Sequence, residues 1–340
     1  MGLDRENETR LFRKFEKGNR NLITDVPGVK VGHVTLRDGD IQTGVTAILP
    51  HSGNLFREKL FAGVSVINGF GKSVGLVQIQ ELGTLESPIL MTNTLSVGTA
   101  LTGCVRYMLD RNPEIGVKTG TVNCVVTECN DGELNDIRGL HVREEHVLQA
   151  IESAAEDFEE GPVGGGTGME MMGLKGGIGS ASRKLALEGT GFTIGALAMT
   201  NYGTDDNLLI GGDPVGRQIQ DRRTKEDKGS CIVVIATDIP LVDRQLRRVA
   251  LRATHALART GSYSGNGSGD IALAFSTANR VEHFNKSKFK EIRMLYDEEL
   301  SPVFEAVVEV VEEALISSLF HGQTVQGIRG KVLRSLREYI

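Results

Sequence analysis

Short apolar, β-branched runs are spread along the whole chain, whereas long stretches with helical periodicity come mostly in its later part. The apolar runs predict strands near residues 44–50, 63–69, 118–128, 190–203, 230–239 and 270–279. Apolar residues three and four positions apart predict helices over 141–161, 240–261 and 301–320. A layered α/β fold, in which helices cover β-sheets, fits this order of elements. Because the pattern contains no internal repeat and no flexible linker, residues 1–340 are expected to form a single domain.

The charge balance argues against several classes of protein. The chain carries 38 basic and 44 acidic side chains, a net charge of −6, and shows no basic patch that would bind nucleic acid. Its N-terminal segment is too polar for a signal peptide, and no apolar run is long enough to cross a membrane. The four cysteines show no paired CxxC spacing, so no zinc site is expected. We therefore expect a cytoplasmic protein with reduced thiols.

Glycine is abundant, with 42 residues, and clusters between apolar segments rather than in linkers. The densest stretch, GPVGGGTGMEMMGLKGGIGS at 161–180, predicts tight turns and close backbone approaches around a site. It does not match a dinucleotide-binding fingerprint, because no clear strand precedes it, and it lacks the lysine that a phosphate-binding loop needs. No organic cofactor is therefore expected.

The most informative local feature is the Gly229–Ser230 bond. The charged segment DRRTKEDKG ends at Gly229, and the apolar segment SCIVVIATDI begins at Ser230, so an exposed loop is expected to enter a buried strand here. Cleavage of this bond would make Ser230 a new N-terminus. Its hydroxyl would be a nucleophile, and its α-amine, with a reference pKa of about 8, would be a nearby base. On the local pattern alone, an ordinary loop-to-strand junction is the more common explanation of the same residues.

Other hydrolase machinery is missing from the sequence. There is no GxSxG elbow, and the seven histidines form neither an HExxH motif nor an evident triad, so a hydrolase would need a different base. Three polar clusters are candidates for one site. Asn201 ends a strand and would present its amide to an oxyanion, and Glu128 ends another strand and would bind an ammonium group. Ser268 and Asp270 lie in a glycine-rich turn. Each cluster is also explained as ordinary loop or capping residues.

A series of longer motifs occurs in the order typical of one family. They are NLITDVPGVKVGH, INGFGKSVGLVQIQELGTLESPILMTNT, GGGTGMEMMGLKGGIGSASR, TNYG, DPVG, GSCIVVIATDIP, GNGSGDIALAFSTAN and FEAVVEVVEEAL. Through these motifs, which span most of the chain, the sequence resembles the DmpA-type L-aminopeptidase/D-esterase family, which includes the β-aminopeptidases. The resemblance implies an α-β-β-α sandwich similar to that of N-terminal-nucleophile hydrolases, reached by a different chain order.

The resemblance also implies a precursor that cuts itself at Gly229–Ser230. The products would be an α chain of residues 1–229 and a β chain of residues 230–340. Family members assemble as oligomers, often as tetramers of αβ units, so a homo-oligomer is implied here.

Roles for individual residues follow from the same resemblance. By position, Ser230 is implied to be the nucleophile, Asn201 an oxyanion donor, and Glu128 the anchor for the α-amine of the substrate. Ser268 and Asp270 are implied to be the polar pair beside the new N-terminus.

Two positions depart from the family's pattern. Some members carry tyrosine or tryptophan two positions after the amine-binding glutamate, where this chain has Asn130. Its amide can still donate a hydrogen bond to the substrate but cannot stack on it. Asp270 stands where some relatives carry glutamate, and it is shorter by one methylene. Because losing one oxyanion donor typically costs about 10²–10³ in turnover, a changed substrate class is an alternative.

The sequence therefore predicts an autoprocessed serine aminopeptidase or amidase that releases N-terminal residues from short peptides, amides or esters without a metal. Ser230 would attack the acyl carbon, and its α-amine would take the proton directly or through Ser268. Two alternatives stay open. One is an acyltransferase of the ornithine acetyltransferase type, which uses threonine at the cleavage point. The other is an unprocessed binding protein of the same fold.

Overall fold

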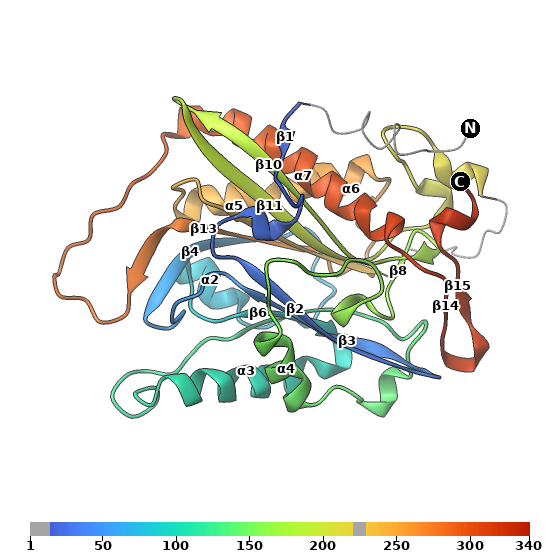
Figure 1. The fold of residues 1–340 in the computed structure, drawn as a ribbon, viewed down its shortest axis with the longest axis horizontal. Coiled ribbons are helices and arrows are strands. Elements are labelled where there is room, and N and C mark those ends of the chain that lie inside the picture. The colour runs from blue at the N-terminus through green and yellow to red at the C-terminus, as the bar shows by residue number, and fades with distance from the viewer. Residues whose placement is uncertain (1–13, 220–228) are drawn as a thin grey trace.

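The computed structural model describes residues 14–219 and 229–340, which form a larger and a smaller sheet packed face to face (Figure 1). In spatial order, the larger sheet contains β1 (Glu16–Lys17), β10 (Gly177–Leu187), β11 (Thr190–Asn201), β12 (Ser230–Thr237), β13 (Ile271–Glu282), β4 (Glu58–Val66) and β5 (Thr84–Leu85). The smaller sheet contains β2 (Lys30–Asp38), β3 (Ile41–Leu49), β6 (Ile89–Asn93) and β7 (Val125–Cys129).

Helices cover the outer face of each sheet. The larger sheet is covered by α5 (Asp243–Leu251), α6 (Ala253–Arg259) and α7 (Leu300–Phe320), and the smaller by α3 (Val97–Arg111) and α4 (Glu144–Glu152). The short helix α2 (Leu76–Leu82) packs beside β4 and β5. Two small hairpins complete the described strands: β8 (Glu170–Met171) with β9 (Leu174–Lys175), and β14 (Val325–Gln326) with β15 (Val332–Leu333). The layered α-β-β-α fold expected from the sequence is thus confirmed. No helix among the described residues is long and apolar enough to span a membrane.

Strand β12 shows how the layers are held together. All of its residues are buried. Cys231, Val233 and Ile235 join the core beneath the helices, whereas Ile232 and Val234 join the core between the two sheets. Because successive side chains of a strand point to opposite faces, a strand buried on both faces reads as one continuous apolar run.

The topology brings the ends of several strands together. Asn201, the last residue of β11, lies opposite Ser230, the first residue of β12. Strands β12 and β13 run parallel, so the loop before β13 also reaches this point. From the smaller sheet, the thiol of Cys129 at the end of β7 donates a hydrogen bond to the carbonyl oxygen of Ser230 at 3.3 Å. Segments far apart in the sequence therefore meet around Ser230.

Most predicted strands are confirmed, with shifted ends, as β3, β4, β11, β12 and β13. The strand predicted over 118–128 is shorter and begins only at Val125. The helix predicted over 240–261 is two helices, α5 and α6, with Arg252 between them.

The helix predicted over 141–161 was too long, since α4 ends at Glu152. The chain leaves the helix because Ala155 exchanges two backbone hydrogen bonds with Val31 of β2, at 3.0 Å each. Pairing with the sheet thus replaces helical hydrogen bonds for these backbone groups.

Candidate active site

Ser230 lies where these strand ends converge, and its surroundings are tightly packed. Its Oγ accepts a hydrogen bond from the backbone N–H of Gly269 at 3.1 Å. A Cβ at position 269 would lie 3.0 Å from this hydroxyl oxygen, so glycine permits the close approach. On the other side of Ser230, a Cβ at Gly229 would overlap the carbonyl oxygen of Asn201. The bond between Gly229 and Ser230 therefore lies against the end of β11. Of the charged segment before it, residues 221–228 lie outside the described part of the chain.

Asp270 connects the loop before β13 to the first residues of β12. Its Oδ1 accepts hydrogen bonds from the hydroxyl of Ser268 at 2.6 Å and from the backbone N–H of Cys231 at 2.9 Å. Both Ser268 and Asp270 are fully buried. A serine hydroxyl that donates to a carboxylate keeps its lone pairs for a second partner. Ser268 can therefore accept a hydrogen bond from a neighbouring group while it donates one to Asp270.

Asn201 is held at both ends of its amide. Its Oδ1 accepts the backbone N–H of Glu170 at 2.9 Å, and its Nδ2 donates to the carbonyl oxygen of Asn130 at 3.0 Å. An amide nitrogen carries two N–H groups, so a second one is available to a substrate oxygen. The side chain of Asn130 is exposed, and its Oδ1 accepts the N–H of Gly132 at 2.9 Å. The observed contact between Asn130 and Asn201 is thus made by the backbone of Asn130.

Glu128 contributes a buried carboxylate from the smaller sheet. Its Oε1 accepts the backbone N–H of Lys72 at 2.9 Å, and its Oε2 accepts the hydroxyl of Thr94. A Cβ at Gly71 would lie 3.4 Å from this Oε1 and 3.7 Å from the Cα of Gly269. Glu128 and the loop before β13, whose Gly269 bonds Ser230, are therefore neighbours across Gly71. Sequence reasoning did not single out Lys72 or Thr94, although both stand in motifs that carry the resemblance.

Lys175 is a second residue that sequence reasoning missed. It lies at the end of β9 in the glycine-rich stretch and is fully buried. Its Nζ donates to the carbonyl oxygens of Gly166, Met169 and Gly176 at 3.2, 2.6 and 2.7 Å. Burial lowers the pKa of this amine well below its usual value. In the sequence, only the glycines around Lys175, which predict close backbone approaches, indicate that it lies near a site.

The thiols next to the site are not poised to react. All four cysteines are buried and none is in a disulfide. Burial raises the pKa of both Cys129 and Cys231 well above the usual range for a thiol. Neither thiol is therefore favoured over the Ser230 hydroxyl as a candidate nucleophile.

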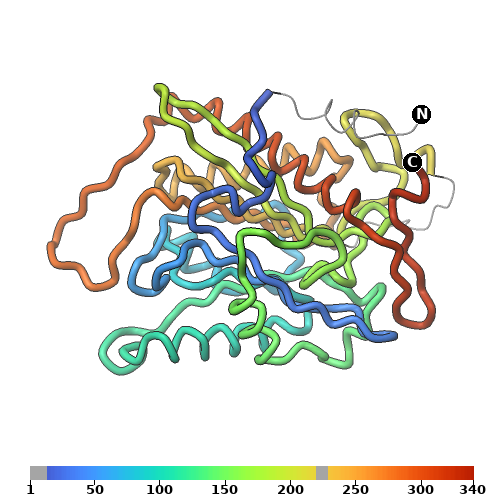
Figure 2. Tube along the Cα trace, viewed as in Figure 1, coloured from blue at the N-terminus to red at the C-terminus, as the bar shows by residue number. Residues whose placement is uncertain are grey.

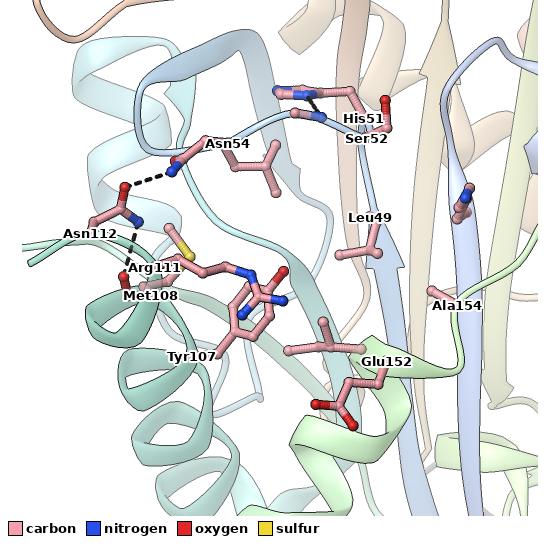
Figure 3. A pocket seen from close by; sticks show the side chains of 14 residues that line it. Leu49, His51, Ser52, Asn54, Tyr107, Met108, Arg111, Asn112, Glu152 and Ala154 are labelled. Carbon is pink, nitrogen blue, oxygen red and sulfur yellow. Dashed lines mark hydrogen bonds between the residues drawn. The ribbon is translucent and has the colours of Figure 1, made fainter.

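A cavity of about 580 Å³ lies away from these residues, between the last residue of β3 and the helices α3 and α4 (Figure 3). The Nδ1 of His51 accepts the N–H of Gly53 at 2.9 Å, and Asn54 donates to Asn112 at 2.7 Å. Two of its polar side chains, Asn54 and Asn112, are thus bonded to each other, and His51 is bonded to the backbone. None of the candidate site residues lines this cavity.

Comparisons with known proteins agree with this arrangement. The model of a family described as peptidase family S58 matches residues 21–333. The beta-peptidyl aminopeptidase BapA of Sphingosinicella microcystinivorans is 37% identical over 345 residues, which cover 94% of this chain and 86% of that relative. The crystal structure of the PH0078 protein from Pyrococcus horikoshii OT3 is 54% identical with a TM-score of 0.93, covering 96% of this chain and 93% of that one.

A further solved structure has a description that states the enzyme class. It is the L-aminopeptidase D-Ala-esterase/amidase from Ochrobactrum anthropi, described as a prototype for the serine aminopeptidases and a new variant of the Ntn hydrolase fold. It is 38% identical with a TM-score of 0.90, covering 97% of this chain and 95% of that one.

The layered fold and these matches together define a serine aminopeptidase. The family model spans nearly the whole chain, and the identities to relatives extend over almost its full length. The chain belongs to peptidase family S58. The resemblance and the enzyme class predicted from the sequence are confirmed, and the findings favour an aminopeptidase over the acyltransferase and the unprocessed binding protein.

Proposed function

We propose that Ser230 is the nucleophile of a self-processing aminopeptidase that acts on substrates with a free amine. The observation that carries this proposal is the position of Ser230, which is the first residue of a buried strand with its hydroxyl bonded to Gly269. The same strand end faces Asn201 and the Ser268–Asp270 pair.

The first step proposed is cleavage of Gly229–Ser230 within a single domain of residues 1–340. Ser230 Oγ would attack the carbonyl carbon of Gly229, and the peptide nitrogen would take a proton and leave as the α-amine of Ser230. Water would then hydrolyse the ester that links the two chains, 1–229 and 230–340. The absence of a side chain at position 229, where a Cβ would overlap the neighbouring strand, supports this site of cleavage.

In the mature enzyme, the α-amine of Ser230 would act as the base. It would take the proton of the Ser230 hydroxyl directly, or through Ser268. In the second route the Ser268 hydroxyl, which Asp270 holds in place, would turn its proton to the amine as it takes the proton of Ser230. Asn201 and a backbone N–H would donate to the developing oxyanion. The protonated amine would then give its proton to the leaving group, and water would release the acyl group from the serine.

Glu128 would select the substrate by its amine. A carboxylate bonded to an ammonium group forms a charge-assisted hydrogen bond, and Glu128 is only 2% exposed, so water would screen this bond weakly. The relatives are named for beta-peptidyl and L-amino-acid substrates and for D-Ala esters. We therefore propose short peptides, amino-acid amides and esters with a free N-terminal amine as substrates, which Asn130 would contact at the edge of the site.

We also propose a cytoplasmic homo-oligomer of αβ units, with neither nucleic acid nor membrane as a partner. The net charge of −6 supports this choice of partners. The segment between β13 and α7 projects from the body of the molecule, in orange in Figure 2. It exposes Phe284, Phe289 and Tyr296, and Phe289 is 88% exposed. Large apolar side chains gathered on a projecting segment are typical of a subunit contact.

The proposed nucleophile is tested by labelling with a serine-directed sulfonyl fluoride, followed by peptide mapping, in the wild type and in Cys231→Ala. We expect both proteins to lose aminopeptidase activity in proportion to the modification of Ser230. Inactivated enzyme that carries the label on another residue, with Ser230 unmodified, overturns the assignment.

A further inference from the structure

The contacts of Lys175 lead directly to the proposed oxyanion site. An ammonium group has three N–H donors and no acceptor, and each of the three carbonyl oxygens around Lys175 accepts one of them. Burying a charge is costly unless it is fully hydrogen-bonded, so this arrangement fixes the backbone of the glycine-rich stretch around the amine. The hairpin that carries Lys175 has only two residue pairs of its own, Glu170 with Lys175 and Met171 with Leu174.

One peptide group joins Lys175 to Asn201. The carbonyl of Met169 accepts the shortest of the lysine's three hydrogen bonds, at 2.6 Å. The N–H at the other end of the same planar peptide, that of Glu170, donates to Asn201 Oδ1 at 2.9 Å. A hydrogen bond from a cation to the carbonyl polarises the peptide and strengthens its N–H as a donor.

This donor determines which end of the Asn201 amide faces the site. Because the N–H of Glu170 requires an acceptor, the oxygen of the amide must lie on that side. Nδ2 then points the other way, where it donates to the carbonyl oxygen of Asn130 at 3.0 Å and has a second N–H for the substrate. With the amide turned over, its oxygen would face the developing negative charge instead.

We propose that Lys175 is a positioning residue for the oxyanion site, acting through the Met169–Glu170 peptide to hold Asn201 with its Nδ2 towards the substrate. The inference rests on the proposed role of Asn201 as an oxyanion donor. Lys175 itself touches neither substrate nor nucleophile, so its effect is expected on turnover and not on binding of the substrate amine.

A double-mutant cycle tests this coupling. Lys175→Gln, Asn201→Ala and the double variant are compared with the wild type for kcat and KM, with Lys184→Gln as the control lysine variant on the exposed part of β10. A displacement of about 1 Å in a catalytic group can cost about 100-fold. We expect Lys175→Gln to lower kcat by about this factor with little change in KM. In the Asn201→Ala background, the same substitution should have no further effect, because its only route to the reaction has been removed.

The linking peptide is tested by a matched pair of variants. Glu170→Pro removes the N–H that bonds Asn201, whereas Glu170→Ala keeps it, and we expect kcat of the proline variant to be at least about tenfold below that of the alanine variant. Thermal midpoints of all variants identify any that do not fold. If a folded variant is purified with Gly229–Ser230 still largely intact, the slow first-order rate of this cleavage replaces kcat in the cycle. Cleavage of this bond develops an oxyanion as well.

The outcomes separate this inference from the proposed function. If the losses from Lys175→Gln and Asn201→Ala multiply in the double variant, Lys175 acts elsewhere and the inference is overturned. If Asn201→Ala loses turnover while Lys175→Gln keeps it, the inference alone fails. If Asn201→Ala keeps full kcat, the proposed role of Asn201 fails and the inference fails with it.

Discussion

Glu128→Gln is the substitution that tests most sharply how the enzyme chooses its substrates. The change removes one negative charge and little volume. A glutamine oxygen still accepts the N–H of Lys72, and the hydroxyl of Thr94 can rotate to accept from the new amide, so the local structure should persist. What is lost is the charge-assisted bond to the substrate's ammonium group. A hydrogen bond to a charged group is worth about 1.5–3 kcal/mol, which corresponds to about 10- to 150-fold in kcat/KM.

The assay compares an aminoacyl anilide that has a free amine with its N-acetylated form. We expect the wild type to cleave only the free amine, and Glu128→Gln to lose 10- to 150-fold in kcat/KM on it by the same reasoning. Glu86→Gln is the control, because Glu86 is also a buried carboxylate that accepts a backbone N–H, at 2.8 Å, but lies outside the site. The reasoning is refuted if the wild type cleaves both substrates equally well, or if Glu128→Gln keeps the full preference.

Three further predictions concern processing and stability. Gly229→Ala should slow self-cleavage by about 100-fold, because its Cβ would overlap the neighbouring strand, whereas Gly191→Ala, which meets no atom within 4 Å, should process normally on a gel time course. Burial raises the pKa of Asp131 to about 7, so the folded state holds this proton more tightly and stability falls as pH rises towards 7. The free energy of unfolding of Asp131→Asn, measured with urea, should therefore rise relative to that of the wild type by about 2–3 kcal/mol from pH 5 to pH 8. The same pH dependence of stability in both proteins would contradict this. Arg183→Met removes the buried cation that pairs with both Glu309 and Glu313, of which only Glu313 keeps another cation, Lys17. It should cost about 3–5 kcal/mol, against about 0–1 kcal/mol for Lys184→Met at an exposed pair.

The strands that carry the candidate site could be predicted because they are buried on both faces. Strand β12 is one continuous apolar run, and Ser230 stands at its first position. Asn201 and Asp270 likewise adjoin apolar runs, so their place at strand ends followed from the pattern. Nothing in the local sequence shows that Glu128, on the other sheet, lies near Ser230, since that proximity depends on how the two sheets pack. The resemblance supplied it.

Other elements escaped prediction because partners distant in sequence stabilise them. Strand β10 is glycine-rich and buries Arg183, whose guanidinium pairs with Glu309 and Glu313 of α7. Helix α3 contains glycines that weaken a helical pattern, yet at Gly103 a Cβ would lie 2.9 Å from that of Val147, so the residue permits α3 and α4 to pack closely. Lys175 reads as a surface residue from its type alone, and only the surrounding carbonyl oxygens explain its burial.

Self-processing at Ser230 is the central claim, and the intact mass of the purified protein together with N-terminal sequencing tests it most directly. The wild type should give two chains whose masses match residues 1–229 and 230–340, the smaller beginning SCIVV. Ser230→Ala should give one chain of about 37 kDa. A wild type that stays intact after prolonged incubation yet hydrolyses substrate, or a Ser230→Ala variant that is still cut after Gly229, would contradict the account.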